Sequence, residues 1–224
     1  MNCLAIDTSS DYLSLAIRHG DRVATLHEPA DQAHAERALP GIRRLLDELG
    51  ISLEDLDAVV YGQGPGSFTG LRIACGLAQG LAFAAGLKVI GIPTLDCMAA
   101  QAQGRVIVCL DARMHQVYTA AYDTTAWQRL TPITLLDPAQ VTVPDDKHDW
   151  TGVGNGFAVY AEALADRLAP QLAGLASGIR PQASTLLSLA QSGRYAQVQA
   201  HEAGLLYIRD KVALTSIEQK AQRK

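Results

Sequence analysis

A glycine-rich stretch carries the strongest chemical signal in this sequence. The segment GQGPGSFTGLR (62–72) follows an apolar run and leads into an alanine-rich segment. Glycines such as Gly64 and Gly66 permit unusual backbone angles, and the free N–H groups at the start of a helix attract anions. The segment is therefore either a phosphate-binding turn or a tightly packed strand-to-helix turn, in which Ser67 or Thr69 caps the helix.

The common phosphate-binding motifs do not match this turn. A Walker A loop needs a Lys followed by Ser or Thr, and no Lys stands between Gly62 and Leu87. A dinucleotide-binding fingerprint needs GxGxxG after a first strand, and Gly70 is out of step with that spacing. These mismatches favour a packed turn, with an anion or a partner contact at 67–70 as the second reading.

Two aspartates stand where apolar runs end. Asp7 closes the run that begins the chain, and Asp111 closes a similar run in the second half. Carboxylates at such ends hold metals or magnesium nucleotides in some proteins, and they are also ordinary turn residues. The candidate nucleotide or anion contacts are Asp7, Thr8, Gly64, Gly66, Ser67, Thr69, Asp111 and Arg113.

Other catalytic chemistries find no support in the residue pattern. The six histidines form no i, i+4 pair and no HExxH motif, so we expect no zinc site. The serines lack a GxSxG context. The cysteines lack CxxC spacing and stand in apolar segments, so we expect buried, reduced thiols at Cys3, Cys75, Cys97 and Cys109.

Composition narrows the class of protein. A net charge of −4 and a pI near 5.8 exclude a free-standing nucleic-acid binder, so any role on RNA would be shared with a basic partner. The longest weakly polar run, 73–85, is short of the ~20 residues that cross a bilayer. With no basic leader before Asp7, we expect a cytoplasmic protein that does not enter a membrane.

The order of elements indicates an α/β protein with two related halves. Three apolar runs before residue 30 predict an antiparallel meander, and leucines at helical spacing predict a helix from about 39 to 49. A strand (57–61), a helix (67–85), a strand (88–92) and a helix from Pro93 follow, as in a ribonuclease-H-like unit. The pattern restarts after Gly104, which predicts lobes at 1–103 and 104–224.

The predicted helix 67–85 carries small residues at four-residue spacing. Ala74, Ala78 and Ala82 form one row, and Gly76 and Gly80 stand beside it. Small rows let backbones approach closely, either against the protein's own sheet or against a helix of another subunit. Both readings remain open at this point.

Several segments together resemble the TsaB (YeaZ) family. They are LAIDTS, AHAERALP, YGQGPGSFTGLRIACGLAQGLA, IGIPTLDCMA, LDARMHQVY and YIRDKVA, in order from Leu4 to about Ala213. The resemblance implies two ribonuclease-H-like lobes of the acetate and sugar kinase, chaperone and actin superfamily, with the second lobe reduced. It also implies a role in making threonylcarbamoyladenosine beside the tRNA anticodon.

The resemblance further implies a partner, the catalytic paralogue TsaD. TsaD carries an HxxxH metal pair on a helix that corresponds here to PTLDCMAA, where Thr94 and Met98 stand at the ligand spacing. Neither residue suits iron or zinc, so we expect no metal and no cofactor in this chain and a non-catalytic role. ATP and a metal would belong to partner subunits, namely TsaD and the ATPase TsaE, and tRNA would be met only indirectly.

The resemblance also implies where the partner binds. The helix from about Ala35 and the helix 70–85 would pair with their TsaD equivalents, and the same surface would pair with itself in a homodimer when the chain is alone. The expected interface residues are His34, Gly70, Ile73, Ala74, Gly76, Leu77, Gly80 and Leu81. Two rival functions are an ATP-dependent kinase or ATPase of the same superfamily, using Asp7 and Asp111, and a peptidase.

Overall fold

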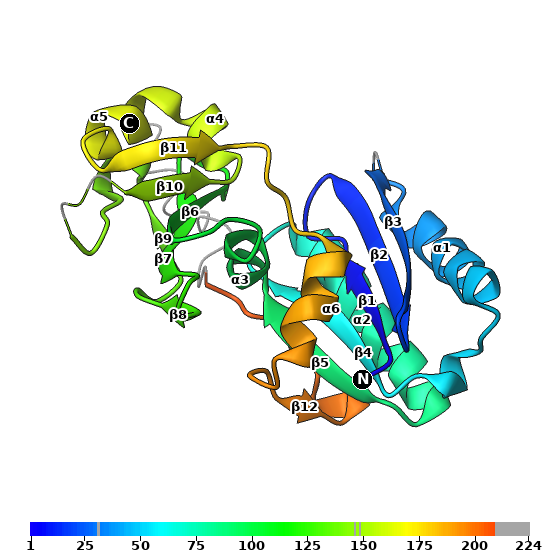
Figure 1. Cartoon of the computed structure of the whole chain (residues 1–224). Helices are drawn as coiled ribbons and strands as arrows, with labels where there is room; N and C mark the ends of the chain where they lie inside the picture. The colour runs from blue at the N-terminus through cyan, green and yellow to red at the C-terminus, as the bar shows by residue number, and fades with distance from the viewer. Residues whose placement is uncertain (31, 146, 148, 209–224) are drawn as a thin grey trace, which may run out of the picture.

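Five strands from the first part of the chain and one from near its end build a six-stranded mixed sheet (Figure 1). The computed structural model describes residues 1–30, 32–145, 147 and 149–208. The sheet order is β12-β5-β4-β1-β2-β3. As predicted from the order of elements along the chain, β1 to β3 are an antiparallel meander, and β1, β4 and β5 are parallel. The strands are β1 (Cys3–Asp7), β2 (Tyr12–His19), β3 (Arg22–Pro29), β4 (Ala58–Gly64), β5 (Lys88–Pro93) and β12 (Gln197–Val198).

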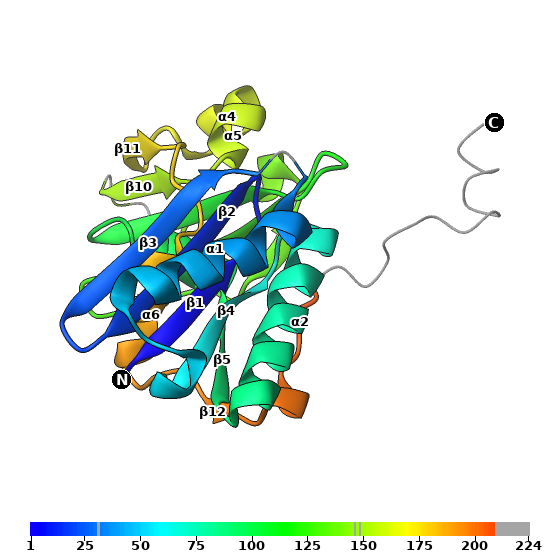
Figure 2. The ribbon, with the colours of Figure 1, turned by 90° about the vertical axis from the view of Figure 1, so that its right-hand side faces the viewer.

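Helices cover both faces of this sheet because its central strands are apolar on both sides. In β1, Leu4 and Ile6 pack under the first pair of helices, whereas Cys3 and Ala5 pack under α6. The first pair, α1 and α2, lies side by side in Figure 2. The helices are α1 (His34–Leu49), α2 (Phe68–Ala85), α3 (Thr94–Ala99) and α6 (Ala183–Gln191), with short 3-10 turns η1 (Leu53–Asp55) and η3 (Ala200–Glu202).

The second sheet repeats the strand directions of the first. β6 is antiparallel to β7 and parallel to β10, and β10 is parallel to β11. In the first sheet, β1 is likewise antiparallel to β2 and parallel to β4, and β4 is parallel to β5. This repetition agrees with the predicted restart after Gly104. Its elements are β6 (Arg105–Asp111), β7 (Val117–Asp123), β8 (Gln128–Arg129), β9 (Thr134–Leu136), η2 (Pro138–Gln140), β10 (Trp150–Val153), α4 (Gly156–Val159), α5 (Ala161–Leu168) and β11 (Leu172–Ala176).

The predicted boundary between lobes, 1–103 and 104–224, is wrong for the end of the chain. After β11 the chain returns to the first sheet, where Leu186 and Leu187 of α6 are buried and β12 pairs with β5. The Ala183 N–H donates a hydrogen bond of 2.9 Å to the Ser14 hydroxyl, which anchors the start of α6 on β2. Burial of apolar side chains on the open face of the first sheet explains the return. Most of the YIRDKVA segment lies outside the described residues.

A buried carboxylate links the two sheets. Asp96, in α3, accepts hydrogen bonds from the Tyr122 hydroxyl of β7 (2.9 Å) and the Tyr195 hydroxyl beside β12 (3.0 Å). Arg129 of β8 binds the same carboxylate with two nitrogens, at 3.2 and 2.9 Å. The four donors satisfy the charge of Asp96 and hold three segments of the chain on one side chain.

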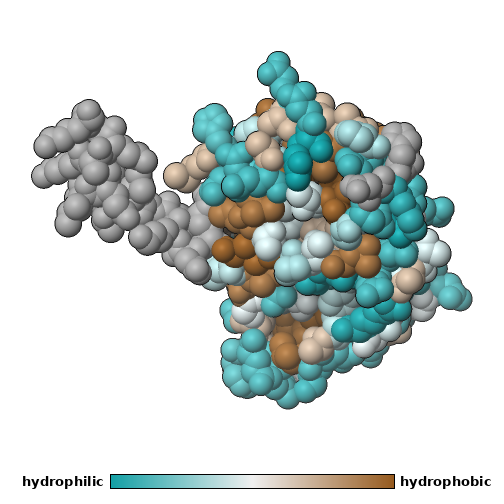
Figure 3. All heavy atoms as spheres, turned by 90° about the vertical axis from the view of Figure 1, so that its left-hand side faces the viewer, coloured by the Kyte–Doolittle hydropathy of each residue, from teal (hydrophilic) through white to brown (hydrophobic). Residues whose placement is uncertain are grey.

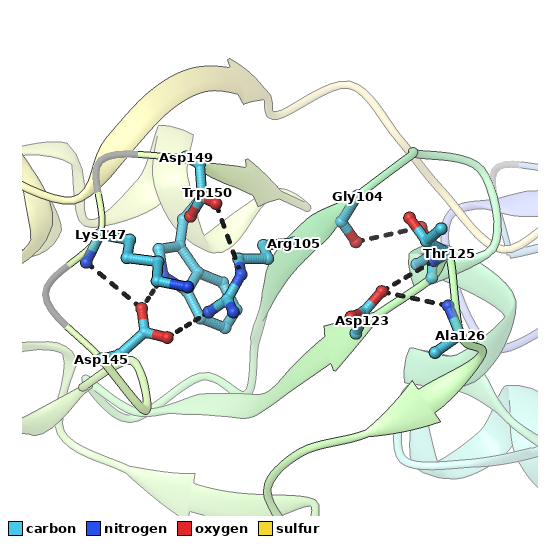
Figure 4. A network of polar contacts seen from close by, with 10 residues as sticks. Gly104, Arg105, Asp123, Thr125, Ala126, Asp145, Lys147, Asp149 and Trp150 are labelled. Atoms are coloured by element: carbon cyan, nitrogen blue, oxygen red, sulfur yellow. Dashed lines mark hydrogen bonds and ion pairs between the residues drawn. The ribbon is translucent and has the colours of Figure 1, made fainter.

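An ion-pair network closes the loop before β10 (Figure 4). Arg105, at the start of β6, contacts the carboxylates of Asp145 and Asp149, and the Trp150 indole N–H donates to Asp145 at 3.3 Å. The Arg105 guanidinium also lies 5.4 Å from the centre of the Trp150 ring. Arg105, Asp145 and Asp149 pair with one another in this network, so we assign it to stability of the second sheet.

Candidate functional site: the glycine-rich turn and the exposed face of helix α2

The glycine-rich turn packs against the turn that follows β1. The Ser67 N–H donates to the carbonyl oxygen of Ser9 (2.8 Å), and the Thr8 hydroxyl donates to the carbonyl oxygen of Gly70 (2.7 Å). A methyl group on Gly66 would lie 2.8 Å from the Ser9 carbonyl oxygen, and one on Gly70 would lie 1.8 Å from that of Thr8. The glycines are therefore needed for this close approach of two backbones.

Local hydrogen bonds also occupy the start of α2. Ser67 caps the helix, and its side-chain oxygen accepts from the Gly70 N–H at 3.3 Å, as predicted for this residue. Thr69 is exposed and is not the cap. Gly64 is buried with φ +113°, and the Leu206 carbonyl oxygen lies 2.9 Å from where a methyl group on it would be. The turn is a packed joint, which favours a tightly packed strand-to-helix turn over a phosphate-binding turn.

Asp7 is enclosed within this joint. The side chain is fully buried, and one carboxylate oxygen accepts from the Ser9 N–H and hydroxyl, both at 2.9 Å. The other oxygen has no hydrogen-bond partner within the described residues and lies against the backbone of Gly62. Burial raises the pKa of Asp7 to about 6, and the bonds from Ser9 offset part of that rise.

Asp111 stands at the matching position of the second sheet. Its carboxylate accepts from the Arg113 N–H (2.8 Å) and the Tyr160 hydroxyl (2.9 Å). The Arg113 side chain is 89% exposed and lies 3.5 Å from the same carboxylate. Across the described part of the chain, no hydrogen bond or ion pair joins Asp111 or Arg113 to the group around Asp7. The structure thus brings the candidate anion contacts together as two separate clusters.

Side chains that bind metals are not clustered among the described residues. No group of three or more His, Cys, Asp or Glu is placed there to hold a metal ion. Thr94 and Met98 are buried in α3. The four cysteines are buried and reduced, as predicted, and burial raises the pKa of the Cys3 thiol to about 11.

Helix α2 has two faces with different surroundings. Gly70, Ala74, Ala78 and Ala82 form the buried row and pack on the protein's own first sheet. Gly70 and Ala74, expected in a partner interface, therefore cannot reach a partner. Close backbone packing against β4 and β1 explains why this row is small.

The opposite face of α2 is open. A methyl group added at Gly76 or at Gly80 would meet no atom of the described residues within 4 Å. Ile73 is partly exposed beside them, and Phe83, which the sequence reasoning missed, is 83% exposed. We call Ile73, Gly76, Gly80 and Phe83 the open face of α2.

The remaining expected interface residues lie at the edge of this face or away from it. Leu77 and Leu81 are partly buried against the core. His34, the first residue of α1, is only 9% exposed, and its Nε2 is buried without a hydrogen-bond partner in the described structure. His34 therefore contributes to the packing of α1 rather than to an exposed surface.

By length and composition, α2 is also apolar enough to cross a membrane. A single such helix is weak grounds for a membrane span, because the core helices of soluble proteins pass the same test. The buried row of α2 packs on the first sheet, which favours a core helix with one open side.

Other exposed apolar side chains are scattered. Val159 of α4 and Leu175 of β11 are more than half exposed. Figure 3 views the molecule from the side of the second sheet and shows apolar atoms there in separate patches among polar ones. Scattered apolar residues of this kind are ordinary on protein surfaces. The open face of α2 differs because its exposed residues follow one another along a single helix.

Comparison with known proteins places these features in a family. Residues 26–216 match the family model described as TsaD, tRNA N6-adenosine threonylcarbamoyltransferase. The chain is 37% identical over 172 residues to the tRNA threonylcarbamoyladenosine biosynthesis protein TsaB of Escherichia coli, covering 72% of this chain and 74% of that protein. For TsaB of Haemophilus influenzae the identity is 32% over 230 positions, covering 95% of each.

A solved structure is similar over nearly the whole chain. It is described as YeaZ from Pseudomonas aeruginosa, with a TM-score of 0.82 and 36% identity, covering 92% of this chain and 99% of that one.

Proposed function

The chain belongs to the TsaB (YeaZ) family, and we propose that it is the non-catalytic subunit that binds and supports TsaD while TsaD transfers the threonylcarbamoyl group to tRNA. The proteins it resembles are named for tRNA threonylcarbamoyladenosine biosynthesis, and the matching family model is that of TsaD itself. A paralogue of a catalytic subunit is a natural partner for it, since similar surfaces can form a pseudo-symmetric pair.

The observation that carries this proposal is the open face of α2. A glycine inside a helix costs about 1 kcal/mol relative to alanine. Among the described residues, nothing in the fold needs that cost at Gly76 or Gly80, because a methyl group at either position would meet none of their atoms. A helix of another subunit that approaches closely along this face would need both glycines.

The buried joint around Asp7 supports the non-catalytic part of the proposal. Its carboxylate is fully buried and faces Gly62, and the carbonyl oxygens of Ser9 and Thr8 lie against Gly66 and Gly70 at the start of α2. Asp111 is held by Tyr160 and by the backbone of Arg113. Both aspartates hold their own turns, and the second oxygen of Asp7 is buried against Gly62, so neither presents an accessible carboxylate to a magnesium nucleotide.

The remaining parts of the proposal concern the assembly. Alone, the chain would form a homodimer through the same face of α2. TsaE would act on the heterodimer, and ATP and a metal ion would belong to those partner subunits. The tRNA would be held by the complex rather than by this acidic chain, and the assembly would work in the cytoplasm.

Two rival functions rank below this one. A kinase or ATPase would need Asp7 exposed to a nucleotide, and titration with ATP and magnesium that gave tight binding and hydrolysis would revive it. A peptidase would need a nucleophile beside a base, and one solved neighbour is titled as similar to a peptidase. Cleavage of a peptide that is lost on replacing His34 would revive that reading.

The proposal is tested by binding of the purified chain to TsaD. We expect wild type to form a heterodimer and Gly80→Leu to lose it while remaining folded, since overpacking a close helix contact costs about 1–3 kcal/mol. Ala165→Leu, on the exposed side of α5, is the matched control and should bind as wild type does. Equal binding by all three proteins would rule out the open face of α2 as the interface.

A further inference from the structure

An arginine lies close to two aromatic rings at the start of α2. The Arg72 guanidinium carbon lies 3.3 Å from the centre of the Phe68 ring and 5.5 Å from that of Tyr207. Both rings are 52% exposed. We call Phe68, Arg72 and Tyr207 the Arg72 clamp.

The clamp is assembled from segments far apart in the sequence. Tyr207 reaches α2 because the segment before it is fixed along β4: the Leu206 N–H donates to the Gln63 carbonyl oxygen at 2.9 Å. The Gly204 carbonyl oxygen accepts from the Tyr61 hydroxyl at 2.5 Å. Contact with the two rings restricts the guanidinium before any partner arrives, so less entropy is lost on binding.

Arg72 has no acidic partner among the residues that the structure describes. Its only hydrogen bond there is donated by NH1 to the Phe68 carbonyl oxygen, at 3.3 Å. It is also the single charged residue of the 18-residue helix. Within the described structure, the guanidinium therefore presents unpaired N–H donors on an otherwise uncharged helix.

The clamp continues the open face of α2. Arg72, Gly76 and Gly80 follow one another at four-residue spacing, which places them in one row along the helix. A subunit lying along the open face would reach Arg72 at the end of that row. Aromatic residues and arginine are the types that most often dominate binding energy at interfaces.

We propose that the Arg72 clamp binds an aspartate or glutamate side chain of TsaD at the end of the α2 interface. Guanidinium and carboxylate form paired, charge-assisted hydrogen bonds, and the two rings fix the guanidinium plane for them. The inference rests on the proposed function, since it names the chemistry that TsaD presents at the same surface.

The clamp would also discriminate between TsaD and a second copy of this chain as binding partners. Helix α2 carries no acidic residue, so pairing of two α2 faces brings two Arg72 side chains to one interface without a carboxylate from either helix. An interface that satisfies one partner and leaves a charge unpaired in the other discriminates between them. The clamp thus favours the heterodimer over the homodimer.

The test measures binding of the full-length chain to TsaD by calorimetry, and self-association by sedimentation, for wild type and Arg72 variants. We expect Arg72→Ala to weaken TsaD binding about 10-fold or more and Arg72→Glu to weaken it further. Arg72→Lys keeps the charge without the planar fork and should fall between wild type and Arg72→Ala. Self-association should not weaken in any of them.

A salt series and a control variant make the test specific. Raising NaCl from about 50 to about 300 mM should weaken TsaD binding more for wild type than for Arg72→Ala, because the variant lacks the charge pair. Arg167→Ala, an exposed arginine of α5 on the second sheet, should behave as wild type. Equal thermal unfolding midpoints would show that the variants are folded.

The outcomes distinguish the two proposals. If wild type binds TsaD and the Arg72 variants bind equally well with equal salt dependence, the clamp proposal fails and the proposed function stands. If the variants weaken self-association as much as TsaD binding, the carboxylate belongs to a second copy and the clamp proposal fails. If wild type does not bind TsaD, both proposals fail.

Discussion

The Thr8 hydroxyl donates a hydrogen bond of 2.7 Å to the carbonyl oxygen of Gly70, and the Thr8 carbonyl oxygen lies where a methyl group on Gly70 would stand. The turn after β1 and the first turn of α2 therefore form one packed joint. This relationship explains why the stretch is rich in glycine without any bound phosphate being required.

Replacing Gly70 should consequently damage the fold rather than a binding site. A methyl group at this position would lie 1.8 Å from the Thr8 carbonyl oxygen, which is backbone and cannot move cheaply. We expect Gly70→Ala to lower the free energy of unfolding by about 3 kcal/mol or more. Urea denaturation followed by circular dichroism measures this. A loss below about 1 kcal/mol would show that the joint is looser than described.

Gly76 and Gly80 should respond in the opposite direction. Alanine fits at both positions and favours the helix, so Gly76→Ala and Gly80→Ala should each stabilise the isolated chain by about 0.5–1 kcal/mol. The same substitutions should weaken TsaD binding, since each adds a methyl group to a close contact. Thermal unfolding and calorimetric binding, measured on the same samples, give both quantities. A gain in stability with unchanged binding would count against the interface.

Asp7 should make the stability depend on pH. Its pKa of about 6 in the folded chain lies above the value near 3.8 of an ordinary aspartate, so folding takes up a proton between these pH values. The stabilising effect of protonated Asp7 is complete below about pH 4 and is lost as the pH rises through about 6, by up to about 3 kcal/mol.

The test for Asp7 compares urea unfolding of wild type and Asp7→Asn across this range. Asparagine keeps an oxygen that can accept the two bonds from Ser9 and does not titrate. Wild type should lose stability relative to Asp7→Asn from about pH 4 to about pH 6. A constant difference between the two proteins over that range would show that Asp7 does not titrate there.

The ion pair between Asp96 and Arg129 should contribute more to the free energy of unfolding than a surface ion pair does. Asp96 is buried and receives two of its four hydrogen bonds from Arg129, so Arg129→Ala leaves a buried charge poorly paired. We expect a loss of about 2 kcal/mol in the free energy of unfolding, reduced by the partial exposure of Arg129.

A surface pair provides the control for Arg129. The exposed pair Arg43 and Asp47 on α1 has the same charges at i, i+4 spacing. Arg43→Ala should cost less than about 0.5 kcal/mol. Chemical denaturation of both variants checks the comparison, and equal costs would mean that burial of Asp96 adds nothing.

The sequence was sufficient to predict what depends on local pattern. The meander before residue 30, a helix cap at Ser67 or Thr69 and the strand-ending positions of Asp7 and Asp111 all follow from apolar runs and turn residues, and the structure shows that Ser67 is the cap. It could not predict the return of the chain to the first sheet, because β12 is only two residues long and α6 carries no local signal of which sheet it covers.

The two faces of α2 show a second limit of prediction from the sequence. Ala74, Ala78 and Gly76, Gly80 are all small and repeat every four residues, so spacing alone does not say which row is buried. Only the position of the first sheet decides this, and it places the alanines inside and the glycines outside. Phe83 and Tyr207 were missed because their exposure depends on how the whole chain packs.

The measurement that tests the account most directly is reconstitution of threonylcarbamoyladenosine in tRNA from purified components, with TsaD, TsaE and a supply of threonylcarbamoyl-adenylate, with and without this chain. We predict that modified tRNA forms only when the chain is present, and that Gly80→Leu supports it poorly while Ala165→Leu supports it as wild type does. Equal modification without the chain, or with Gly80→Leu, would contradict the account.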